Sequence, residues 1–321
     1  MRTYVISRII LNVPVVFLVI TLVFLASHAV PDYATRRVAQ SLQGSSSYQE
    51  AVQQVKKDLG LDKPLWEQYG RYVGGVLKGD LGNSLLTKRP VLTELKNRLP
   101  PSLELGILDL IVALSVSIPI GVISAVRQDT WIDYILRFFA ILWVAIPSFY
   151  LAVLLLLFSF KGLGWTPPLT GTGYRSLLDD PVQNLQMMAL PAIAGGIATG
   201  AGIMRLLRSQ MLEVLRQDYV RTAWAKGLRE RTIVMRHALR NALIPVVTIA
   251  GLTVGTLISG NVILESMFSI PGIGLYTVNS IRQNDFPAAQ GIILLVAIAL
   301  VFTNLAVDLA YGWLDPRIRY Q

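Results

Sequence analysis

Long apolar runs alternate with polar segments along the whole chain. An α-helix needs about 20 mostly apolar residues to cross the roughly 30 Å of hydrocarbon in a lipid bilayer. Six stretches approach or exceed that length: 9–29, 103–126, 135–160, 187–204, 243–264 and 289–313. Because lipid offers no partner to a free backbone N–H or C=O group, each stretch is predicted to be a helix. The pattern therefore predicts an all-α integral membrane protein built as a six-helix bundle.

A polar segment, residues 31–102, separates the first two predicted helices. Within it, Ser47-Tyr48-Gln49-Glu50 is a capping-box pattern that predicts a helix as far as Leu59. Asp62-Lys63-Pro64 predicts a second helix through Leu77, with the proline in the first turn, where its missing N–H costs nothing. We favour a small folded helical segment over a solvated spacer. The predicted domains are thus a membrane helix (1–30), an extracytoplasmic segment (31–102) and a core of five helices (103–321).

Cations are concentrated in the connection at 205–242. The chain is 53% hydrophobic and 15% charged, with a net charge of +9. Lys and Arg accumulate in short cytoplasmic connections of membrane proteins, so this segment and both termini are predicted to lie in the cytoplasm. The basic residues of 31–102 do not oppose this topology, because the rule weakens for loops longer than about 60 residues. Membrane topology also explains the positive charge without a nucleic-acid partner.

The same connection, 205–242, is longer and richer in helix-forming residues than a link between two membrane helices requires. Ala223 and Gly227 are four positions apart, so a helix places them on one face, where small residues let another backbone approach. Arg221 and Lys226 can flank such a contact with charge. The pattern predicts a docking helix for another protein. A plain helix that ends with Gly227 as its C-terminal cap explains the same residues.

Motifs for catalysis and cofactor binding are missing from the sequence. It has no Gly-x-x-x-x-Gly-Lys-Ser/Thr phosphate loop, so we do not expect it to bind ATP in that way. Its only histidines are His28 and His237 and it has no cysteine, so a zinc cluster is not expected either. Two acids, Asp109 and Asp308, fall inside predicted membrane helices, where an unpaired charge is costly. We favour structural pairing for both over a proton relay.

Four segments, in this order along the chain, share their residues with one known family. They are Lys78-Gly79-Asp80-Leu81-Gly82-Asn83-Ser84; Tyr219-Val220-Arg221-Thr222-Ala223-Trp224-Ala225-Lys226-Gly227-Leu228 with Arg236-His237-Ala238-Leu239-Arg240-Asn241-Ala242; Glu265-Ser266-Met267-Phe268-Ser269-Ile270-Pro271-Gly272-Ile273-Gly274; and Leu314-Asp315-Pro316-Arg317-Ile318-Arg319-Tyr320. Together they resemble ATP-binding-cassette (ABC) importer permeases of the dipeptide and oligopeptide branch. The general permease pattern, Glu-Ala-Ala-x₃-Gly-x₉-Ile-x-Leu-Pro, is met only in part, because the Glu, Ile and Pro are absent.

The resemblance implies the type I importer (MetI-like) permease fold in the cytoplasmic membrane of a prokaryote. It also implies partners: a second homologous permease, two ABC ATPase subunits that hold ATP and Mg²⁺, an extracytoplasmic solute-binding protein, and a peptide substrate. The family's ATPase-coupling loop corresponds to Tyr219, Arg221, Thr222, Ala223, Lys226, Gly227 and Leu228. Pro271, Gly272 and Gly274 are expected at the outer end of the fifth helix, where they would shape an external gate or contact the binding protein.

Other functions remain open at this stage. The same branch includes carriers of nickel, glutathione and sugars, so the resemblance leaves the substrate undecided. A secondary transporter driven by an ion gradient would need linked acids or broken half-helices in paired repeats near the bilayer midplane, and the sequence offers neither. A membrane-bound enzyme would need a catalytic constellation, which the sequence also lacks.

Overall fold

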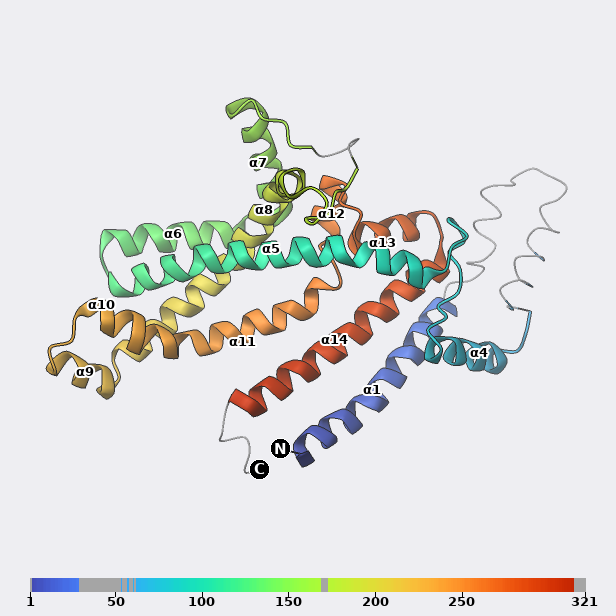
Figure 1. Cartoon of the computed structure of the whole chain (residues 1–321), viewed down its shortest axis with the longest axis horizontal. Helices are drawn as coiled ribbons and strands as arrows, with labels where there is room; N and C mark the ends of the chain where they lie inside the picture. The colour runs from blue at the N-terminus through green and yellow to red at the C-terminus, as the bar shows by residue number, and fades with distance from the viewer. Residues whose placement is uncertain are drawn as a thin grey trace. The chain divides into compact units, whose positions relative to one another are not determined.

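The computed structural model is helical over nearly all the residues that it describes, which are 2–28, 53, 57, 60, 62–168 and 173–314 (Figure 1). In chain order the helices are α1 (Arg2–His28), α4 (Leu65–Leu77), α5 (Val91–Val126), α6 (Trp131–Ala145), α7 (Ser148–Gly162), α8 (Pro181–Leu215), α9 (Asp218–Ala225), α10 (Glu230–Thr232), the π-helix η1 (Ile233–Ala238), α11 (Leu239–Leu257), α12 (Val262–Phe268), α13 (Ile273–Arg282) and α14 (Phe286–Leu314). Five helices in this part of the chain are long and apolar enough to cross a membrane, and the bent pair α6–α7 makes a sixth if it counts as one span. The all-α class is confirmed, and the helix count is consistent with the six predicted spans if α6 and α7 form one of them.

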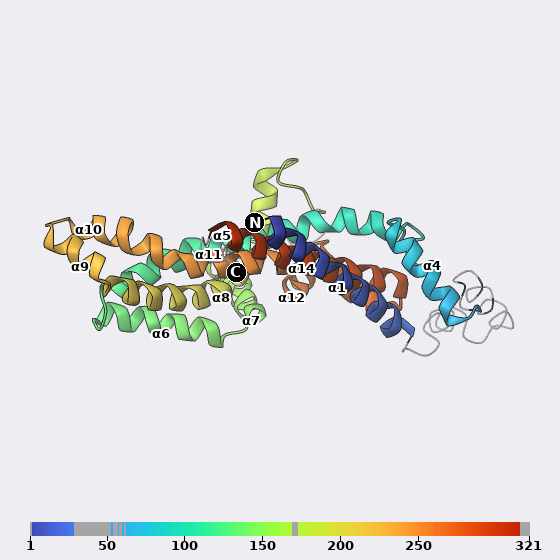
Figure 2. The same cartoon turned by 90° about the horizontal axis from the view of Figure 1, so that it is seen from below.

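The chain divides into two compact units, Met1–Pro100 with Pro271–Gln321, and Pro101–Ile270. In the first unit, α1 lies alongside α14 (Figure 2), and α13 packs against α14 as well. A fully buried acid, Asp285, anchors the turn before α5, because its carboxylate accepts hydrogen bonds from the Ser84 hydroxyl (2.5 Å) and the Leu85 N–H (2.9 Å). The segment 78–84 therefore ends in an anchor inside its own unit.

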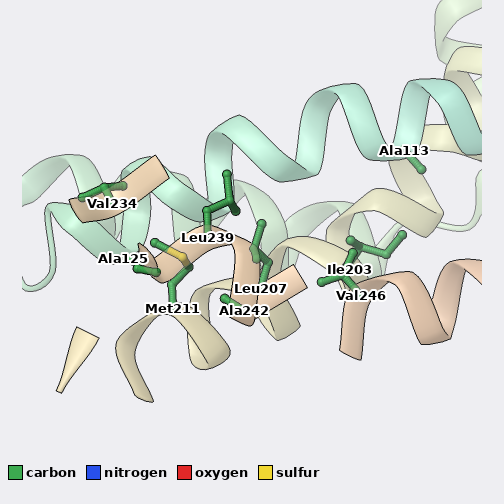
Figure 3. Packing of buried hydrophobic residues seen from close by; sticks show 10 residues of the cluster. Ala113, Ala125, Ile203, Leu207, Met211, Val234, Leu239, Ala242 and Val246 are labelled. Carbon is green, nitrogen blue, oxygen red and sulfur yellow. The ribbon is translucent and has the colours of Figure 1, made fainter. Parts of the chain in front are cut away.

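In the second unit, α8 is the central helix and contacts α6, α7 and α11. Ile203, Leu207 and Met211 recur every four residues, so they share one face of α8, and all three are buried. Figure 3 shows them against Ala242 and Val246 of α11. On another face, a Cβ added at Gly196 would lie 2.6 Å from the Cβ of Val112. Glycine therefore lets α8 approach α5 more closely than any other residue would allow.

The third predicted span, 135–160, is not one helix. It is divided into α6 and α7, which are bent by 106° at a short break. The break falls at Ile146, whose ψ of 120° is extended, and Pro147 then serves as the N-terminal cap of α7. A proline ring clashes with an α-helical residue before it, which forces that residue into extended geometry. The prediction of one continuous helix was therefore wrong, and the break lies at Pro147, a residue that can be read from the sequence.

Other helix bounds also differ from the predicted ones. α5 begins at Val91 and α8 continues to Leu215, so residues 205–215 are the last turns of a helix and not part of a loop. The fifth predicted span ends at Leu257, and α12 follows after a turn in which Gly260 has a φ of +70°. α4 confirms the helix predicted after Pro64. The helix predicted at 47–59 and the motif 315–320 lie outside the fully described residues, and the division at residues 30 and 102 stays a prediction.

Candidate coupling site

The short helix α9 ends in a well-formed glycine cap. Gly227 has a φ of +73°, a left-handed conformation that glycine adopts without a Cβ penalty. Its N–H donates to the Trp224 carbonyl (2.9 Å), while the Leu228 N–H donates to the Ala223 carbonyl (3.3 Å). These two bonds are the pair that defines a Schellman motif. Gly227 therefore terminates α9, as the capping interpretation of the sequence predicted.

One side of α9 packs inside its own chain. Val220 is fully buried and Ala223 is 6% exposed, and both contact Ile233 of η1. This corrects the prediction that Ala223 and Gly227 together offer a small-residue face to a partner. The helix is only eight residues long, so it is held in place by the inward contacts of Val220 and Ala223. A partner can therefore reach only the other side.

That other side combines aromatic, apolar and cationic residues. Tyr219, Trp224 and Leu228 are 44%, 48% and 38% exposed, and the Arg221 side chain is 73% exposed. We name this the α9 surface; it consists of Tyr219, Arg221, Thr222, Trp224, Lys226, Gly227 and Leu228, all of which are exposed. Aromatic residues and arginine are the types enriched at protein–protein contacts. Trp224 was not among the predicted site residues, although its exposure makes it the largest apolar group on this surface.

α9 and α10 lie at one end of the second unit, past the end of α6 (Figures 1 and 2). Two connections join α9 to the helices that follow. Val220 and Ala223 contact η1, and the Asn241 side-chain amide of α11 donates to the Tyr219 hydroxyl at 2.8 Å. η1 continues into α11 and shares a buried cluster with it, in which Val234 and Ala238 contact α8 residues. Packed side chains thus connect α9 to α8 and α11.

The predicted outer-gate residues lie at the start of α13. Gly272 is the N-terminal cap of that helix in an extended conformation (φ −94°, ψ −175°), and Gly274 is buried in its first turn. The turn before them is made by Ser269, whose φ is +54°. The predicted place, the outer end of the fifth helix, needs correction. α12 intervenes between that helix and Pro271, because Asn261 caps a new helix by accepting from the Leu264 N–H (3.2 Å).

Of the two acids predicted to lie inside membrane helices, the structure describes the side chain of one. Asp109 lies in α5, and its Oδ1 is buried without a hydrogen-bond partner among the described residues. This contradicts the structural pairing that we predicted for it. The reason is that Gly195 of α8, which has no side-chain donor, faces this carboxylate. Asp308 lies in α14, and its side chain is outside the part of the chain that the structure describes.

A third acid, which the sequence analysis missed, does form the ion pair. Asp133 of α6 is completely buried and lies 2.6 Å from the Arg208 guanidinium of α8, while the Ser124 hydroxyl of α5 donates to it as well. Asp133 lies just before the predicted span, and Arg208 was assigned to a loop. Asp133 and Arg208 are far apart in the sequence, so no local sequence pattern predicts that they pair. Among the described residues, no group of three His, Cys, Asp or Glu side chains could hold a metal ion.

Comparison with known proteins identifies the family of the chain. Residues 117–320 match the family described as "Binding-protein-dependent transport system inner membrane component", and residues 1–106 match the N-terminal family of the same components. The chain belongs to this family. Its members are membrane subunits of ABC importers, so the chain is a multi-pass inner-membrane permease.

Curated relatives cover the full length of the permease. It is 37% identical to the dipeptide transport system permease protein DppB of Alkalihalophilus pseudofirmus, over all of both chains. It is 35% identical to the glutathione transport system permease protein GsiC of Escherichia coli strain K12, and 36% identical to GsiC of Pectobacterium atrosepticum, again over all of each chain. The dipeptide-permease resemblance of the sequence is therefore confirmed.

Proposed function

We propose that this permease couples ATP hydrolysis on partner subunits to the import of short peptides. The observation that supports coupling is the α9 surface, a capped helix with exposed aromatic and cationic residues that is packed onto η1 and α11. The relatives support the substrate class. Dipeptides and glutathione are both short peptides with a free α-ammonium group. Separate uptake measurements with a dipeptide and with glutathione distinguish these two substrates.

The proposed assembly has two membrane subunits and two ATPases. This chain pairs with a second homologous permease, and an ABC ATPase that holds ATP and Mg²⁺ docks on the α9 surface from the cytoplasm, where both termini also lie. An extracytoplasmic binding protein delivers the peptide, and no nucleic acid takes part. When ATP closes the ATPase pair, α9 moves, and its contacts to η1 and α11 pass the movement to the membrane helices. The chain itself needs no cofactor for this role.

Substitution of Gly227 by Arg tests the docking role. At a φ of +73° a side chain costs about 1–2 kcal/mol, and the new cation also disturbs the α9 surface. We expect the variant to insert normally but to lose co-purification of the ATPase subunits and peptide uptake in proteoliposomes with the binding protein.

Gly164→Arg is a matched control. Gly164 also has a positive φ (+63°), and an added Cβ would meet no atom within 4 Å, but this glycine lies in the loop after α7. The backbone cost is therefore the same, and only the location differs. We expect Gly164→Arg to retain ATPase docking. Wild-type uptake by Gly227→Arg, or equal losses in both variants, would contradict the assignment of the α9 surface. Uptake that needs an ion gradient and no ATPase would instead identify a secondary transporter.

A further inference from the structure

A cavity of about 340 Å³ lies among the helices of the second unit. Its lining comes from α5, α8, α11 and the turn into α12, and the polar groups among the described residues are Ser102, Asp109, Thr199, Thr253, Ser259 and Asn261. Binding cavities for small molecules span roughly 300–1,000 Å³ and carry a few placed polar groups within an apolar lining. This cavity has that size and that composition, and α5, α8 and α11 are all candidate membrane spans.

Asp109 is the one ionisable residue among the described residues that line the cavity. Its Oδ1 is buried without a hydrogen-bond partner in the part of the chain that the structure describes. Glycine makes room for the carboxylate, because a Cβ added at Gly195 would lie within 2.8 Å of both its oxygens. An unpaired acid within a membrane helix is costly and is by default a functional group. No lining residue that the structure describes offers a compensating positive charge.

The neighbouring acid, Glu265, is used in a different way. It is fully buried, and its Oε1 accepts hydrogen bonds from the Ser102 hydroxyl (2.7 Å) and the Asn261 N–H (3.2 Å). Glu265 therefore fixes two lining residues to each other across α5 and the turn before α12. The Glu265 carboxylate is thus used within the wall of the cavity, whereas the Asp109 carboxylate is not.

We propose that Asp109 binds the primary ammonium group of the substrate as it passes through the permease. An ammonium group has three N–H donors and no acceptor. A carboxylate supplies the opposite charge, and Ser, Thr and Asn oxygens that line the same cavity can accept further N–H groups. Dipeptides and glutathione both carry such an ammonium group. The inference rests on the proposed peptide transport and adds a recognition site within the membrane subunit.

Carbodiimide labelling of the assembled transporter in membranes tests the site directly. The reagent modifies accessible carboxylates, and mass spectrometry of the α5 peptide reports modification at Asp109. We expect dialanine to reduce this modification, while N-acetyl-dialanine and sodium chloride at the same concentration leave it unchanged. Equal modification in all samples would overturn the proposal. Protection by sodium chloride without protection by dialanine would overturn it too, because it would identify a site for an inorganic cation.

Uptake by two charge-matched variants gives a second measurement. We expect Asp109→Asn to lower dialanine uptake by about tenfold or more, because it removes one partner of a desolvated charge pair. Asp129→Asn makes the same change at an exposed turn residue outside the cavity and should transport like wild type. Both variants should keep ATPase stimulation by the loaded binding protein. Unchanged uptake by Asp109→Asn would overturn the site alone, whereas a wild-type complex without peptide-stimulated ATPase activity would overturn the proposed function.

Discussion

At the residue scale, one buried ion pair joins three helices of the second unit. Asp133 has no exposed surface, and both of its oxygens accept from Arg208, at 2.9 Å and 2.6 Å. Removing one member of a buried pair leaves the other charge uncompensated, which costs about 3–5 kcal/mol. We expect Asp133→Ala to lower the free energy of unfolding by that amount, seen as a lower unfolding temperature of the detergent-solubilised protein.

The double variant Asp133→Ala/Arg208→Met is the control for this prediction. Replacing both members of a buried pair by apolar groups is often close to neutral. The double variant should therefore unfold at a higher temperature than Asp133→Ala alone. Losses that simply add would show that the two side chains are not coupled.

At the element scale, the π-helix η1 connects the docking elements to α11. π-helices are rare in proteins, but those that occur are often found at functional sites. A π-helical turn contains one residue more than an α-helical turn. Deleting Met235, which is 52% exposed, should convert η1 into α-helix. Each residue turns a helix by 360°/3.6, so α9 would rotate by about 100° about the axis of α11. We expect membrane insertion without peptide uptake.

Met235→Ala separates the effect of the helical register of η1 from the effect of the Met235 side chain. It keeps the residue count of η1 and removes an exposed group, so uptake should remain near that of the wild type. If the deletion variant transported as well as Met235→Ala, the π-helical register of η1 would have no role in coupling.

At the scale of the whole molecule, the sequence contains no cysteine, so single cysteines can report on which side of the membrane each segment lies. Leu178 (95% exposed) lies between α7 and α8, and Trp224 (48% exposed) lies on α9. The cations around α9 predict that it faces the cytoplasm. A membrane-impermeant maleimide should therefore label Leu178→Cys in intact cells, and Trp224→Cys only after permeabilisation. Labelling of Trp224→Cys from outside would reverse the topology.

Sequence alone determined the features that depend on one segment and its solvent. Apolar length predicted the spans, because a chain in lipid can satisfy its backbone only as helix or closed barrel. Gly227 predicted the end of α9 for a similarly local reason, since its φ of +73° suits no other residue as well. The bend at Pro147 is equally local, because a proline forces the residue before it out of α-helical geometry.

Only the tertiary structure decided which side chains meet. Ala223 packs against Ile233, and Asp133 pairs with a residue on another helix. The Asp109 carboxylate faces Gly195, and its Oδ1 has no hydrogen-bond partner among the described residues. An apolar pattern shows that a helix face is buried but not what buries it. That depends on how closely two helices approach, which small residues such as Gly195 and Gly196 set jointly with their neighbours on α5.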